Sequence, residues 1–143
     1  MYSITDDRMM HILTVARQMK EKSMELGWTE EKSQEMFVLG LNHDLGYEFG
    51  ENSNHHLIGG TILKNMTFKY YQEVLYHGVN DCEYQSKELD LLNWADMHTD
   101  GKGNRVTFEE RLTDIAVRRG KESRAYIESE KMCNSLVKKG WQA

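Results

Sequence analysis

Six imidazole and carboxylate side chains fall where the helical pattern of the sequence would turn them toward the interior. The stretch VLGLNHDLG, residues 38–46, shows this best, because its apolar run meets His43 and Asp44 side by side. His43 follows Leu39 by four residues and Met36 by seven, so it lies on their helical stripe. The same spacing places the other members on or near apolar faces. The full set is His11, His43, Asp44, His55, His77 and Asp96.

A divalent cation is the simplest partner that these groups could share. Buried carboxylates need a compensating charge, and the basic side chains of the sequence mostly fall on polar faces or in loops. One cation would offset Asp44 and Asp96 together and would use neutral imidazoles as ligands. Each residue alone has an ordinary interpretation as a core histidine or an ion-pair partner. Their convergence from five helical segments favours a metal site.

The elements that must position these residues are helices. Apolar residues recur at intervals of three and four nearly everywhere, and the chain contains no proline to interrupt a helix. We predict an all-α, single-domain protein, a bundle of about six or seven helices. The expected N-caps are Thr29, Ser53, Ser86 and Thr107, the last in a capping box with Glu110.

Two of these helices carry specific expectations. The second should run from the Thr29 cap to Leu45 and should be central and buried, because its middle section is apolar on every side. The last should span residues 122–138. The length of 143 residues fits one domain, residues 1–143, with a real core.

Composition excludes several other classes of protein. Charged residues make up 29% of the chain and the net charge is −5. Basic residues form no extended block, which argues against a nucleic-acid polymer as partner. No apolar run approaches the roughly 18 residues of a membrane span. Cys82 and Cys133 have no metal-ligand spacing, and with a polar N-terminus they favour a cytoplasmic protein with reduced thiols.

The motifs that carry these residues resemble a known family. HILTVARQM, LGLNHDLG, HHLIGGTIL, LYHGVND and LNWADMHTD follow one another in order between about residues 8 and 119. Together they resemble the H…HD…D signature of the HD-domain superfamily of metal-dependent phosphohydrolases. The resemblance implies one HD-type phosphohydrolase domain with an all-α fold.

The resemblance also implies how the ligands divide. Members of the family that add two intermediate histidines usually bind two divalent ions per chain, drawn from Mn, Fe, Co, Ni or Mg. One ion would take His11, His43, Asp44 and Asp96, and the other would take Asp44, His55 and His77. His43 and Asp44 would then be the catalytic pair, and a site with one ion is the alternative.

Substrate recognition departs from the family pattern at one position. Many members continue H-D-I-G-K, whereas Tyr47 replaces that lysine here. Arg8, three residues before His11, matches a phosphate-binding arginine of the family. Lys102 and Arg105, in the loop after Asp96, are further candidates, although all three basic residues would also suit an exposed surface.

The expected activity is hydrolysis of a phosphate ester or phosphodiester by metal-activated water. The substrate would be a small, phosphorylated, nucleotide-like molecule. Two alternatives stay open. One is a di-iron oxygenase that cleaves a C–C or C–P bond, as some relatives with six ligands do. The other is a non-catalytic, metal-stabilised domain that binds a ligand. His56 is expected to face away from His55, and the oligomeric state is not predicted.

Overall fold

The computed structural model of the protein describes residues 4–46 and 55–143, and within these ranges it contains seven helices and no strand. This confirms the predicted all-α class. The helices are α1 (Asp6–Glu25), α2 (Glu30–Asn42), α4 (His55–Asn65), α5 (Tyr71–Tyr76), α6 (Lys87–Met97), α7 (Phe108–Arg119) and α8 (Arg124–Lys138).

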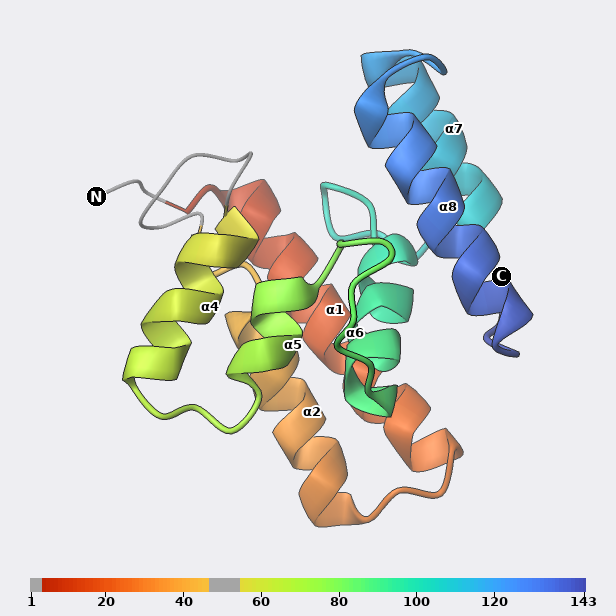
Figure 1. Ribbon diagram of the computed structural model, residues 1–143. Helices are drawn as coiled ribbons and strands as arrows, with labels where there is room; N and C mark the ends of the chain where they lie inside the picture. The colour runs from red at the N-terminus through yellow and green to blue at the C-terminus, as the bar shows by residue number, and fades with distance from the viewer. Residues whose placement is uncertain (1–3, 47–54) are drawn as a thin grey trace.

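The helices pack as pairs around α1 and α6 (Figure 1). Helix α1 contacts both α2 and α6, and α5 joins α4 to α6. Helices α7 and α8 form a hairpin that is attached to the rest of the molecule through contacts between α6 and α8. In the described part of the chain, no helix is long and apolar enough to cross a bilayer.

The predicted helix starts are confirmed where the structure describes them. The side chains of Thr29 and Ser86 accept hydrogen bonds from backbone N–H groups in the first turns of α2 and α6. Thr107 and Glu110 form the predicted capping box. Helix α8 begins at Arg124, two residues later than predicted, because Ser123 is its N-cap. The predicted cap at residue 53 lies outside the described residues.

The prediction for the second helix was wrong in two respects. Helix α2 ends at Asn42 rather than at Leu45. It is also not buried on every side, since Val38 and Leu41 are 43% and 37% exposed. Helix α6 takes the central place instead, with most of its apolar residues buried. An apolar surface permits burial but does not require it.

A close contact between helix backbones fixes the end of α2 that carries the candidate site. A Cβ atom added at Gly40 would lie 2.6 Å from the Cα atom of Ala16 in α1. Only glycine therefore lets the two helices approach this closely. The contact anchors the last turn of α2, and His43 follows three residues later.

Candidate metal centre

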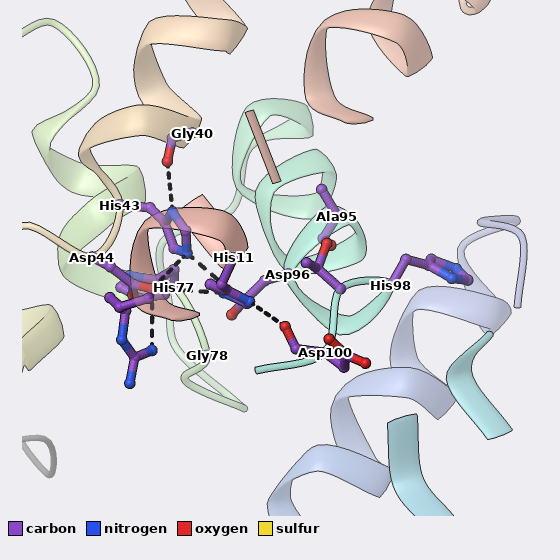
Figure 2. A network of polar contacts seen from close by, with 12 residues as sticks. His11, Gly40, His43, Asp44, His77, Gly78, Ala95, Asp96, His98 and Asp100 are labelled. Carbon is purple, nitrogen blue, oxygen red and sulfur yellow. Dashed lines mark hydrogen bonds and ion pairs between the residues drawn. The ribbon is translucent and has the colours of Figure 1, made fainter. Parts of the chain in front are cut away.

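Helix ends bring the six predicted ligands to one place. His43 and Asp44 lie at and just beyond the C-terminus of α2, His77 follows α5, and Asp96 is in the last turn of α6. His55 is the first residue of α4, and His11 is in the second turn of α1. Figure 2 shows the side chains of His11, His43 and His77 gathered around Asp44.

The Asp44 carboxylate divides the histidines into two pairs. Its Oδ2 atom lies 3.2 Å from Nε2 of His43 and 3.6 Å from Nε2 of His11. Its Oδ1 atom lies 3.3 Å from Nε2 of His55 and 3.7 Å from Nε2 of His77. The result is two candidate metal-binding triads that share Asp44.

Asp96 adjoins the first of these triads. Its Oδ1 atom lies 2.8 Å from Nε2 of His11 and 3.6 Å from Nε2 of His43. Two carboxylates and two imidazoles thus face one another on that side of Asp44.

Backbone carbonyl groups orient three of the imidazole rings in the same way. Nδ1 lies 2.9 Å from the Asp100 carbonyl in His11, 2.6 Å from the Gly40 carbonyl in His43 and 2.5 Å from the Val74 carbonyl in His77. A carbonyl oxygen can only accept, so each Nδ1 must donate. A neutral ring held in this way directs the lone pair of Nε2 toward the cluster, which is the usual outer-shell arrangement of a metal-binding histidine.

If the imidazole rings were neutral, several short contacts in the cluster would join two atoms that have no proton between them. Nε2 of His43 and Oδ2 of Asp44 are buried and have no hydrogen-bond partner among the described residues. Nε2 of His55 lies 3.2 Å from Nε2 of His77, whose Nδ1 atom already carries a proton. Cations between these atoms would satisfy them all. Imidazoles mixed with carboxylates suit Mn, Fe, Co or Ni better than Mg, which prefers oxygen ligands.

Burial and charge act against each other on the titratable groups of the cluster. Burial would raise the pKa of Asp44, but the imidazoles, above all His43, outweigh it and hold that pKa well below its usual range. The pKa of Asp96 is likewise well below its usual range, where burial opposes the stronger combined effect of His11 and His43. Burial would lower the pKa of His43, yet Asp44 and Asp96 raise it well above the ordinary value. When no metal ion is bound, these shifts favour a protonated, positively charged His43.

The end of α2 explains how two adjacent residues reach one centre. Successive residues of an ideal helix point about 100° apart, so His43 and Asp44 could not both face one ion from mid-helix. Residue 42 is the last of α2, and residues 43–45 form a turn. The backbone at Asp44 is therefore not helical, and its side chain can point toward the same place as that of His43.

A cavity of about 370 Å³ opens onto the cluster. Arg8 lines it, with Nη1 3.5 Å from Oδ2 of Asp44. A larger pocket, of about 650 Å³, lies between α7 and α8, but its lining contains none of the cluster residues.

The structure does not bring the two loop candidates to this cavity. The guanidinium of Arg105 pairs with both carboxylate oxygens of Glu21 on the surface, at 2.6 and 3.0 Å. Lys102 is exposed, and its backbone N–H donates to the Asp100 side chain within the loop. Tyr47 lies outside the described residues.

Several residues on the cavity wall were missed by sequence reasoning. Arg111, Arg118 and Arg119 of α7 line the cavity. Their spacing of seven and eight residues places them on one helix face, and this signal was available in the sequence. His56 also lines the cavity, with its ring centroid 6.2 Å from that of His77. Its ring centroid also lies 5.8 Å from that of His55, so the expectation that His56 would face away from His55 was wrong.

His98, although buried, takes no part in the centre. Figure 2 shows its side chain on the far side of α6 from the cluster. Its Nδ1 and Nε2 atoms lie 2.6 Å and 2.9 Å from the carbonyl oxygens of Val106 and Gln142. Its role is to hold the C-terminal residues against α6.

Comparison of the sequence with protein-family models, and of the chain with curated proteins and solved structures, gave no significant match.

Proposed function

We propose that this protein is an HD-type phosphohydrolase that uses two divalent metal ions. The observation that carries the proposal is the division of the Asp44 carboxylate, which turns one oxygen toward His11 and His43 and the other toward His55 and His77. Asp44 would then be a ligand that both ions share. The order of the motifs in the sequence and the all-helical fold support the same assignment.

The proposed ligand sets are those that the resemblance implies, and the distances around Asp44 and Asp96 support them. His11, His43, Asp44 and Asp96 would hold one ion, and Asp44, His55 and His77 would hold the other. When bound, such ions polarise a phosphoryl oxygen and lower the pKa of water toward neutrality. The carbonyl groups of Asp100, Gly40 and Val74 keep three of the rings oriented before any ligand arrives. This preorganisation limits rearrangement of the chain during the reaction.

The substrate side of the proposal rests on the cavity. Its volume of about 370 Å³ suits a small molecule of nucleotide size rather than a polymer. Arg8 lies beside Asp44 at the cavity wall, where it would contact an oxygen of a phosphoryl group held at the centre. The proposed reaction is hydrolysis of a phosphate ester or phosphodiester.

The test is turnover by the purified protein. The wild-type protein, loaded with Mn²⁺, Co²⁺, Fe²⁺ or Ni²⁺, is assayed against nucleotides and phosphodiesters for release of phosphate or of the hydrolysed ester. Asp44→Asn should abolish the activity, because the shared ligand loses its charge. Activity that survives this substitution would refute the proposal, and oxygen consumption by an iron-loaded protein would favour the oxygenase alternative.

A further inference from the structure

One face of α7 forms part of the wall of the cavity that the His/Asp cluster also lines. Arg111, Ile115, Arg118 and Arg119 line it there, and their spacing of four, seven and eight residues from Arg111 marks a single helix face. Helix α7 belongs to the hairpin with α8, whereas the cluster belongs to the other helices (Figure 1). The cavity therefore has two chemically different sides.

Arg111 is the unusual member of this face. Its side chain is only 16% exposed, and its Nε and Nη1 atoms are buried without a hydrogen-bond partner in the described part of the chain. Among the described residues, its one ion pair is with the carboxylate of Asp114, which lies 3.9 Å from Nη1. Arg118 differs, because it is half-exposed and donates to Asp114 at 2.8 Å. A buried guanidinium with unused donors is costly unless an anion completes it.

Arg111 does not supply charge to the cluster itself. Within the described residues, the ion pairs of Asp44 are with Arg8 and four histidines, and those of Asp96 are with two of the same histidines. Arg111 therefore lines the same cavity as the cluster without being an ion-pair partner of its two carboxylates.

The charge of the wall points to a ligand with several negative charges. Among its described residues, four arginines face two aspartates, although the whole chain has a net charge of −5. Divalent ions at the cluster would add to this positive excess. A phosphodiester with one negative charge would compensate less of this excess than a diphosphate or triphosphate group.

We propose that Arg111, with Arg118 and Arg119 beside it, forms a second phosphate subsite, which binds a phosphate group of the substrate other than the one that is hydrolysed. This inference rests on the proposed function for the identity of the reacting group. It narrows the substrate class to molecules with two or more linked phosphates. The side chain of Ile115, between the arginines on the same face, offers an apolar contact to the remainder of the ligand.

The test measures binding of methylenediphosphonate, which cannot be hydrolysed as a diphosphate, and of inorganic phosphate by titration calorimetry. The full chain is used twice, once with Mn²⁺ and once after chelation and removal of the chelator. Arg111→Met should weaken methylenediphosphonate binding about 10-fold or more, because charge-assisted hydrogen bonds are lost. In the Mn²⁺-loaded protein, where phosphate would bind at the cluster, its affinity should change less than about threefold. Arg111→Lys should restore part of the loss of methylenediphosphonate binding.

Arg17→Met is the matched control, because Arg17 is an exposed arginine of α1 that does not line the cavity. It should leave both affinities unchanged. The melting temperature of ligand-free Arg111→Met should equal or exceed that of the wild type, since an unpaired buried charge is replaced by an apolar side chain. A structural role for Arg111 would instead lower it.

Three results would overturn the subsite. They are unchanged methylenediphosphonate binding by Arg111→Met, equal losses for phosphate and methylenediphosphonate in the Mn²⁺-loaded protein, and an equal loss in Arg17→Met. The metal-free titration distinguishes failure of the Arg111 subsite from failure of the proposed function. If the protein bound no metal and hydrolysed nothing, the phosphohydrolase assignment would fall, while the comparison of Arg111 with Arg17 would still decide the subsite.

Discussion

Nε2 of His43 lies 3.2 Å from Oδ2 of Asp44, and neither atom has a hydrogen-bond partner among the described residues. Nδ1 of the same ring is already committed to the Gly40 carbonyl. In the metal-free protein, a proton on Nε2 of His43 would turn this contact into a favourable one. The raised pKa of His43 agrees with such a doubly protonated ring. A metal ion would replace the proton, and the first prediction follows from this exchange.

Metal binding should release a proton and should tighten as the pH rises. Asp44 and Asp96 raise the pKa of His43 well above its ordinary value against the opposing effect of burial, so the metal-free protein holds this proton at neutral pH. The coordinated ring cannot hold it. Calorimetry at pH 7 in buffers of different ionisation enthalpy should show release of about one proton or more per chain. No proton release, with an affinity that is flat between about pH 6 and 8, would contradict this.

The number of metal ions per chain should fall by one or by two, depending on which candidate ligand is replaced. His77→Ala removes a ligand of only one triad, so mass spectrometry should find about one ion fewer per chain than in the wild type. Asp44→Ala removes the ligand that both triads share and should abolish binding of both ions. His56→Ala is the matched control, because His56 lines the cavity but belongs to neither triad. If His77→Ala kept the full metal content, the second site would be wrongly assigned.

Removal of metal should lower the melting temperature and change its dependence on pH. A ligand present at 1,000 times its dissociation constant stabilises the folded state by about 4 kcal/mol. In the chelated protein the raised pKa of His43 stabilises the fold at low and neutral pH. That stabilisation is lost as the pH rises through the folded-state pKa. The melting temperature of the chelated protein should therefore fall as the pH rises above about 7. That of the metal-loaded protein should not.

The depressed pKa values of Asp44 and Asp96 act in the opposite direction. They stabilise the fold above the ordinary carboxyl range, and this contribution is lost as the pH falls below it. Equal melting temperatures with and without metal across the whole pH range would show that no ion is bound.

Substitution of Gly40 should damage both the fold and the centre. The Cβ atom of Gly40→Ala would lie 2.6 Å from Cα of Ala16, so α1 and α2 must separate. We expect a loss of about 1–3 kcal/mol in the free energy of unfolding and weaker metal binding, because the Gly40 carbonyl orients His43. Urea denaturation measures the first effect.

The control for this substitution is Val38→Ala on the same helix. Val38 is 43% exposed, and its replacement should change stability by no more than about 0.5 kcal/mol. A stable Gly40→Ala protein with unchanged metal affinity would show that the close contact between α1 and α2 is not required.

The sequence was sufficient to predict the helical class and the convergence of the six candidate ligands. The reason is that a polar residue at an apolar position of the helical repeat can be recognised from the sequence alone. His43 lies on the stripe of Met36 and Leu39, and both of these are fully buried in the structure. The caps at Thr29, Ser86 and Thr107 are local features whose signal is contained in a few adjacent residues.

Features that depend on tertiary packing were not accessible in the same way. The apolar residues of α2 gave no sign that Val38 and Leu41 would remain exposed, because exposure depends on which helices cover them. The sequence shows that the arginines of α7 share a helix face, but only the fold shows that this face lines the cavity. Arg105 was a candidate by proximity in sequence, but its guanidinium is held by Glu21, 84 residues away.

The most direct measurement is anomalous X-ray diffraction from crystals of the wild-type protein soaked in Mn²⁺. Our account predicts two anomalous peaks, one on each side of the Asp44 carboxylate, within coordination distance of the Nε2 atoms of the two histidine pairs. A map with no peak among these residues, or with peaks only at surface carboxylates, would contradict it.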